Sequence, residues 1–237
     1  MDAVVGAIAT PDVMEQRHGP VCGAGANREG EAIDMKREWL VYLGLLLVTL
    51  IWGNVFVANK YLLQFTSPYH LAALRFVPAG LLFGLFVLIA MRREALALLR
   101  DVRWKMFWLC LFGVVLNTLA LTIGQQSVPA GAGSLVASTN PLFTFILSAI
   151  FLGERPTLKK VFGLALAFAG VVIIVRFAGG QEFDVPYLLG FIVLIGSPFF
   201  WAIYTIMAKP IIARHGALVV TATTTALGSI PFLFLFA

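Results

Sequence analysis

Hydroxyl-bearing side chains interrupt the apolar run from residue 132 to residue 152, and this run is the first place where the sequence could do chemistry. One set of residues follows steps of four, three, four and three along it: Ser134, Ser138, Pro141, Phe145 and Ser148. At 3.6 residues per turn, these steps place the whole set on one face of a helix. Hydrocarbon cannot satisfy hydroxyl groups, so we expect this face to contact protein or water rather than lipid.

The preceding apolar run carries a second polar set. Thr118, Thr122 and Gln125 share one helical face, and Asn117 lies beside them. These groups could meet the serine face described above and Asn140. A polar, uncharged cleft of this kind suits a neutral or zwitterionic organic solute, held by a few hydrogen bonds against an apolar wall. The alternative is that the polar groups only satisfy one another.

Three further residues could contact a solute from the first two apolar runs. Arg75 lies about two turns into the second run, where an arginine is costly unless it reaches the interface or finds partners. We weigh a structural anchor to a neighbouring helix against a substrate or gating contact. Trp52 and Asn54 lie in the middle of the first run, where interhelical packing competes with substrate contact.

A possible hinge and a possible gate flank the serine face. Pro141 removes a helical hydrogen bond, so it should kink the helix and free a carbonyl toward the cleft. Glu154 and Arg155 follow the end of the same run. We expect them to cap the helix and to form ion pairs at an inner gate rather than to bind substrate.

The composition requires a membrane. Of the 237 residues, 60% are hydrophobic and only 12% are charged, and the mean hydropathy is +0.92, which excludes an ordinary soluble domain. We read each of the apolar runs as a transmembrane helix, because backbone groups in lipid must be satisfied within the segment. Seven such runs are predicted: 40–59, 70–90, 106–123, 132–152, 161–177, 187–207 and 217–237.

The distribution of lysine and arginine predicts the orientation. With the N-terminus in the cytoplasm, the inner connectors hold twelve of these residues, and the outer ends hold only Lys60 and Arg176. This bias follows the positive-inside rule. Because the net charge of +5 is spread over short connectors, it indicates topology and not a nucleic-acid partner.

Residues 1–38 mix glycine, proline and charge without periodicity, so we expect a disordered tail, and Met35 is a candidate natural start. Cys22 and Cys110 are badly placed to pair, and neither has metal-ligand spacing with a histidine. We therefore expect no disulfide, no metal and no cofactor. The three histidines lie outside the apolar runs or at their edges, which speaks against an enzyme.

A faint internal echo suggests a repeat. Trp52 and Lys60 are eight residues apart, as are Trp201 and Lys209. If the sixth run restarts the first, each repeat contains five helices, an odd number, so the second copy would be inserted upside down, as in many carriers with inverted repeats.

Several segments together resemble the EamA-type transporters of the drug/metabolite transporter superfamily. They are WGNVFVANK at 52–60, ALRFVPAGLL at 73–82, and GQQSVPAGAGSLVASTNPLFTFILSAIFLGERPTLKKVFGLALAFAG at 124–170. The resemblance implies an all-α carrier of ten helices in the bacterial inner membrane, built from two inverted five-helix repeats. Residues 39–177 would form the first repeat, and residues 187–237 would begin the second.

The resemblance also implies a function. Such a carrier exports small metabolites or drugs, such as amino acids or nucleobases, by alternating access. The chain stops at Ala237 inside the seventh run, so we expect either a C-terminally truncated fragment or two copies that pair as a homodimer. A non-transporting membrane scaffold, or a subunit of a complex, is the alternative.

Overall fold

The computed structural model describes residues 24–152, residues 185–235 and seven isolated positions between 162 and 173, with side chains described from Trp39 onward. By contacts, the chain divides into two compact units, 1–50 and 51–237. The candidate functional groups that the structure describes lie in the second unit.

Every regular element in the described residues is a helix, as predicted. Helix α1 (Ala24–Leu62) continues without a break across the boundary between the two units. A single π-helical turn, η1 (Leu111–Leu116), separates α3 (Arg92–Cys110) from α4 (Asn117–Ser127). The helices are α1 (Ala24–Leu62), α2 (Pro68–Ala90), α3 (Arg92–Cys110), η1 (Leu111–Leu116), α4 (Asn117–Ser127), α5 (Ala130–Ala137), α6 (Asn140–Leu152), α8 (Val185–His215), α9 (Ala217–Gly228) and α10 (Ile230–Leu233).

Five described stretches are long and apolar enough to cross a membrane. They contain five of the seven predicted runs: Trp39–Leu62, Pro68–Ala90, Arg92–Ser127, Ala130–Phe151 and Val185–His215. The predicted run 161–177 lies for the most part outside the described residues. The last run forms α9 and α10, a shorter apolar pair interrupted at Ser229.

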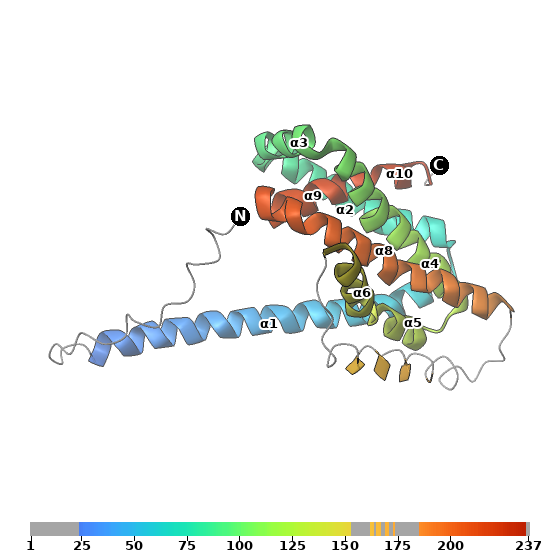
Figure 1. Cartoon of the computed structure of the whole chain (residues 1–237), viewed down its shortest axis with the longest axis horizontal. Helices are drawn as coiled ribbons and strands as arrows, with labels where there is room; N and C mark the ends of the chain where they lie inside the picture. Colours follow the sequence, from blue (N-terminus) through green and yellow to red (C-terminus); the bar gives the residue numbers. More distant parts are fainter. Residues whose placement is uncertain are drawn as a thin grey trace. The chain divides into compact units, whose positions relative to one another are not determined.

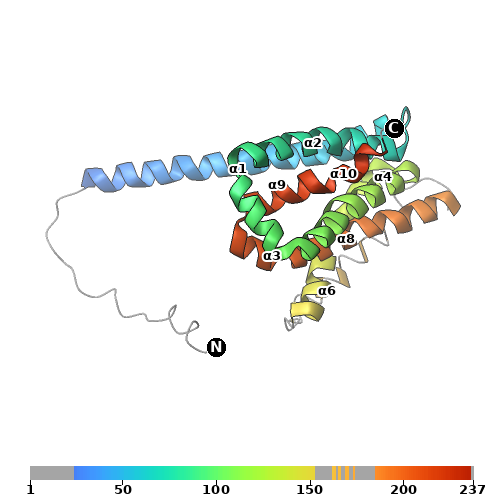
Figure 2. The same cartoon turned by 90° about the horizontal axis from the view of Figure 1, so that it is seen from above.

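Helix α8 is the centre of packing in the second unit. Figures 1 and 2 both show α4 and α8 side by side, and this is the most extensive helix pairing in the described chain. Helix α6 packs on α8 as well, while α2 packs against α9 and α4. Gly216, with a φ of 86°, makes the reversal from α8 into α9, where a side chain would be strained.

Glycines allow these helices to approach closely. A Cβ on Gly124 would lie 2.6 Å from Cβ of Leu194, and one on Gly113 would overlap the ring of Tyr204. On α2, Gly80 and Gly84 face Ser229 and Ala226. Small residues therefore set the helix spacing, as expected where lipid provides no hydrophobic drive between helices.

The serine-bearing run differs from the single kinked helix that the sequence predicted. It forms two helices, α5 and α6, with a turn at Ser138 and Thr139. Pro141 is the second residue of α6, where the missing N–H of proline is one that the helix could not use. The proline thus follows a break in the helix instead of bending a continuous one.

The long helical stretch from Arg92 to Ser127 is irregular at two places. Val102 has non-helical angles, φ −130° and ψ 30°, so α3 consists of two helical segments that meet at a kink. The π-helical turn η1 then places Gly113 against the ring of Tyr204 on α8. Such turns inside α-helices are frequent at functional sites.

Candidate functional site: a pocket between α6 and α8

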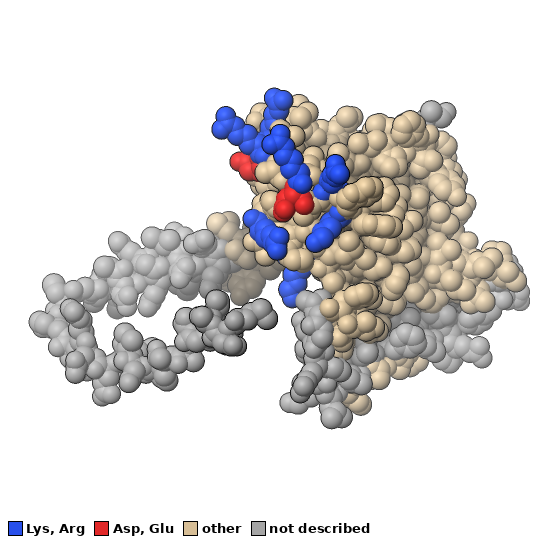
Figure 3. Space-filling view, turned by 45° about the horizontal axis from the view of Figure 1, so that its top comes forward, with Lys and Arg blue, Asp and Glu red and all other residues tan. Residues whose placement is uncertain are grey.

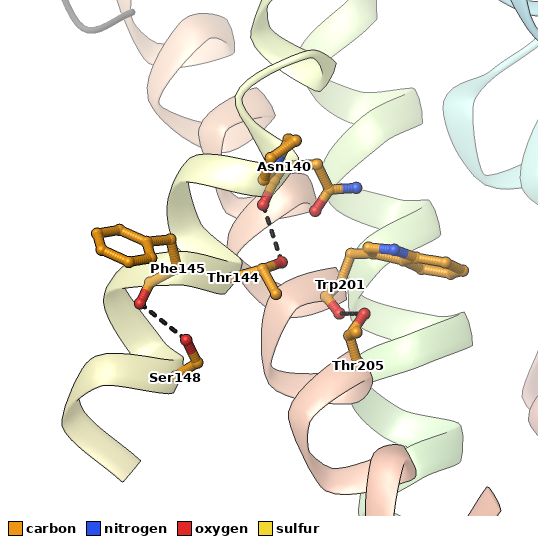
Figure 4. Close-up of a pocket in the computed structure, with 7 residues that line it drawn as sticks. Asn140, Thr144, Phe145, Ser148, Trp201 and Thr205 are labelled. Atoms are coloured by element: carbon orange, nitrogen blue, oxygen red, sulfur yellow. Dashed lines mark hydrogen bonds between the residues drawn. The ribbon is translucent and has the colours of Figure 1, made fainter. Parts of the chain in front are cut away.

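An open pocket of about 440 Å³ lies between α6 and α8 (Figure 4). Helix α6 contributes one side and α8 contributes Trp201 and Thr205. The volume falls in the range of small-molecule sites. No charged side chain lines it among the described residues; its lining residues are Asn140, Pro141, Thr144, Phe145, Ser148, Trp201 and Thr205.

The three hydroxyl groups of the lining donate to their own helices. Thr144 Oγ1 donates to the carbonyl of Asn140 at 2.9 Å, and Thr205 Oγ1 donates to the carbonyl of Trp201 at 2.9 Å. Ser148 Oγ donates to the carbonyl of Phe145 at 3.1 Å. Figure 4 shows these three bonds. Bonding back to the helix is the usual solution for a hydroxyl in a membrane helix, because it satisfies the proton within the segment.

Asn140 differs from the other polar residues of the pocket. Its side-chain oxygen is buried and accepts no hydrogen bond from any described group. In Figure 4 the Asn140 amide lies at the end of the pocket, and its oxygen is turned to the side where Thr144 and Trp201 lie. A buried acceptor without a donor costs free energy. A solute that donates a hydrogen bond to Asn140 Oδ1 would remove this cost.

A second group of polar side chains joins the C-terminal end of α1 to α2 and α4, and we call it the amide network. Asn59 Nδ2 donates to Gln125 Oε1 at 2.8 Å, and Arg75 Nη1 donates to Asn59 Oδ1 at 3.3 Å. Asn59 is 3% exposed and Gln125 is fully buried. Arg75 therefore has a structural partner on α1, which supports the anchor interpretation of this residue.

Lys60 extends the amide network to the end of α4. Its Nζ donates to the carbonyl oxygens of Gln125 at 3.1 Å and Gln126 at 2.8 Å. These carbonyls belong to the last turn of α4, where the helix dipole favours a positive charge. Lys60, which the sequence marked as an exception to the charge bias and as part of the internal repeat, thus caps a helix.

Polar side chains of α4 form hydrogen bonds within the protein, both to the neighbouring helix α8 and to the backbone of their own helical stretch. Ser197 Oγ on α8 donates to Asn117 Oδ1 at 2.7 Å, and Asn117 Nδ2 donates to the carbonyl of Gly113 at 3.4 Å. Thr122 is fully buried, and its hydroxyl donates to the carbonyl of Thr118 at 3.0 Å. Asn117 and Thr122 therefore have partners within the protein, which favours the alternative weighed for them, while Gln125 Nε2 has no hydrogen-bond partner among the described residues.

The remaining predicted site residues are dispersed. Ser134 and Ser138 donate to carbonyls of their own segment, those of Gly131 and Ser134 respectively. Trp52 is 62% exposed, and Asn54 is exposed as well. The predicted gate residues, Glu154 and Arg155, lie outside the described residues. Of the nine predicted binding residues, Asn140 alone lines the described pocket; the others stay predictions.

Sequence reasoning missed the roles of Asn59, Ser197 and Thr205. Asn59 is the last residue of its apolar run, where a polar residue is common. Ser197 and Thr205 lie in a run whose polar residues do not form a face at helical spacing. Trp201 was noticed only as part of the repeat. Within the residues that the structure describes, no three His, Cys, Asp or Glu side chains gather in a way that could hold a metal ion.

The apolar helices and their tight packing define a multi-pass helical membrane protein. The sequence pattern of the EamA-like transporter family matches residues 39–176, and the chain belongs to this family. This result confirms the resemblance, and it supports the expectation of a transporter rather than an enzyme.

Curated relatives are named as transporters. A protein of Archaeoglobus fulgidus named "Uncharacterized transporter" is 35% identical over 199 residues, which is 82% of this chain and 66% of the relative. The "Probable amino-acid metabolite efflux pump" of Escherichia coli K12 is 31% identical, over 71% of this chain and 53% of the relative. The "Probable terminal-alkyne amino-acid exporter" of Streptantibioticus cattleyicolor is 33% identical, over 45% of this chain and 34% of the relative. No solved structure matches the chain significantly.

The chain spans no more than about two thirds of the length of these relatives. The activity of a whole carrier is therefore a matter for proposal.

Proposed function

We propose that the protein carries small organic solutes out of the cell by alternating access, with the α6–α8 pocket as part of the solute path. The pocket itself carries the proposal. Among the described residues, it combines about 440 Å³ of open space, an uncharged lining and a buried acceptor on Asn140 to which no group donates. A site for a metabolite needs these three properties: room, an apolar wall and a few polar groups that orient the solute.

The names of two relatives support the choice of solute. One is a probable amino-acid metabolite efflux pump, and another is a probable amino-acid exporter. A pocket of this size accepts a solute of amino-acid dimensions. We therefore place amino acids and similar organic solutes first among the substrates to be tested, before nucleobases and drugs.

A flux assay with a pocket variant tests the proposal. We expect the 237-residue chain, reconstituted in liposomes, to move at least one amino acid or related solute, and Asn140→Ala to lower that flux about tenfold while membrane insertion is unchanged. The expected loss reflects one hydrogen bond to the solute. Gln64→Ala is the control, because Gln64 is exposed in the turn after α1 and should leave the flux unchanged.

Two results would contradict the transport proposal. Flux that is equal in Asn140→Ala and the unmodified chain would remove the pocket from the path. Absence of flux for every amino acid, nucleobase and cationic drug, together with stable binding to another membrane protein, would favour the scaffold alternative.

The charge distribution supports an inner-membrane protein whose N-terminus is cytoplasmic. The exposed lysines and arginines of α3 and α8 gather at one end of the second unit (Figure 3). His215 at the end of α8 contacts Asp101 on α3 at 3.0 Å, so the two helices meet there. Lysine and arginine near membrane helices are retained on the cytoplasmic side.

Accessibility labelling tests this orientation. A cysteine placed at Arg93 in a background with Cys22→Ser and Cys110→Ala should react with an impermeant maleimide only after the cells are permeabilised. A cysteine placed at Phe65, which is exposed between α1 and α2, should react in intact cells. The reverse labelling pattern would overturn the assignment.

A further inference from the structure

We propose that the α6–α8 pocket binds the protonated amine of its solute, so that it selects primary ammonium compounds over neutral or anionic compounds of the same shape. This inference rests on the proposed function, because it names the chemical group that the pocket recognises. It comes from the direction of the hydrogen bonds in the lining.

The hydroxyl groups of the pocket have no proton left for a solute. Each hydroxyl has one proton, and Thr144, Ser148 and Thr205 all direct theirs to backbone carbonyls of their own helices, at 2.9, 3.1 and 2.9 Å. A hydroxyl oxygen that has donated its proton can still accept through its lone pairs. The three side chains therefore present acceptors to the pocket.

The side-chain oxygen of Asn140 is a fourth acceptor, and no described group donates a hydrogen bond to it. Its Oδ1 atom is buried and unpartnered among the described groups. Among the described residues, the lining holds two kinds of side-chain N–H donor, the Asn140 amide nitrogen and the Trp201 indole. The described lining thus offers four acceptor oxygens and two N–H donor groups to a solute. A solute that brings several N–H donors complements this lining, while a carboxylate would face oxygen lone pairs.

The aromatic side chains favour the same charge. Trp201 and Phe145 both line the pocket, and the faces of such rings attract cations. The described lining contains no lysine, arginine or histidine that would repel a cation. An ammonium group has three N–H donors and a positive charge, so it matches both the acceptors and the rings. A neutral alcohol of equal size has one donor and no charge.

Binding of three probes with one carbon frame tests the inference directly. The 237-residue chain in nanodiscs would be titrated calorimetrically with phenethylamine, phenethyl alcohol and phenylacetate. We expect the amine to bind at least about tenfold more tightly than the alcohol, and phenylacetate to bind more weakly than both. Equal affinities, preference for the anion, or absence of amine binding would each overturn the proposal.

Variants of the acceptors assign this preference to the pocket. Thr144→Val and Thr205→Val each remove one acceptor, and each should weaken amine binding about fivefold while alcohol binding changes less. Thr49→Val is the matched control, since Thr49 makes the same kind of bond, to the carbonyl of Leu45 at 2.8 Å, on the exposed surface of α1. Unchanged amine binding in both pocket variants would refute the assignment.

A gain-of-affinity variant guards against simple misfolding. Asn140→Asp keeps the shape of the side chain but exchanges the amide donor for a carboxylate, so amine binding should tighten about tenfold and phenylacetate binding should disappear. A misfolded protein would not bind more tightly. If Asn140→Asp leaves amine binding unchanged or weakens it, the proposal fails.

The outcomes separate this inference from the transport proposal. Amine binding that follows these variants without any flux would leave the inference standing and refute transport. Flux of solutes without preference for an amine would refute the inference and leave transport standing.

Discussion

Gly124→Ala is expected to force α4 and α8 apart and to lower the free energy of unfolding by about 3 kcal/mol, the upper range for overpacking a core. The new methyl group would lie 2.6 Å from Cβ of Leu194 and 2.7 Å from its Cα and N. Two of these three atoms belong to the backbone, so no side-chain rotation relieves the contact. The pairing of α4 with α8 is the most extensive in the described chain, and the disturbance should spread through it.

Thermal unfolding in detergent, followed by size-exclusion chromatography, measures this effect. Gly131→Ala is the matched control, because a Cβ on Gly131 would meet nothing within 4 Å. Alanine also has the higher helix propensity, so the control should be as stable as the unmodified chain or slightly more stable. If Gly124→Ala and Gly131→Ala melt at the same temperature, α4 and α8 do not approach as closely as described.

Asn59→Leu is expected to be about as harmful, at about 3 kcal/mol, because it breaks the amide network at its centre. The change removes the donor to Gln125 Oε1 and the acceptor of Arg75 Nη1 in one step. Both partners would remain, and Gln125 is fully buried. A buried polar group without its partner costs more than the hydrogen bond is worth when formed, and this cost rises for a charged group.

A double-mutant cycle separates this mechanism from a general loss of packing. Gln125→Leu added to Asn59→Leu removes both amides, so the double variant should lose less stability than the sum of the two single variants, by about 1 kcal/mol or more. Gln64→Leu, at an exposed position after α1, is the control for adding a leucine and should have little effect. Strict additivity of the two single effects would contradict the pairing of Asn59 with Gln125.

The class of the protein was predictable from local properties. The apolar runs, the charges at their ends and the combination of short motifs identified an all-helical membrane protein of this transporter family before any contact was known. Length and hydropathy are enough for this step, because lipid requires each spanning segment to satisfy its own backbone.

The candidate pocket depended on arrangement in space. Asn140 was found from its place among apolar residues, but its partners in the pocket, Trp201 and Thr205, lie about sixty residues later. The break at Ser138 and Thr139 further turned the serine stripe into two separate segments, so Ser134 and Ser138 do not line the pocket with Ser148. A helical wheel assumes one continuous helix, and it fails where the chain turns.

The amide network shows the same division most clearly. The sequence marked Arg75 as a costly residue that needs partners, with anchoring as one solution, and it placed Gln125 on a polar helix face. It did not indicate Asn59, which lies 66 residues before Gln125 and joins the two. Periodicity determines which residues share a helix face, whereas the rotation and pairing of separate helices determine which faces meet. The rotation and pairing of helices depend on how many side chains fit together at once, such as Leu194 against Gly124. This fit is determined only in the folded structure.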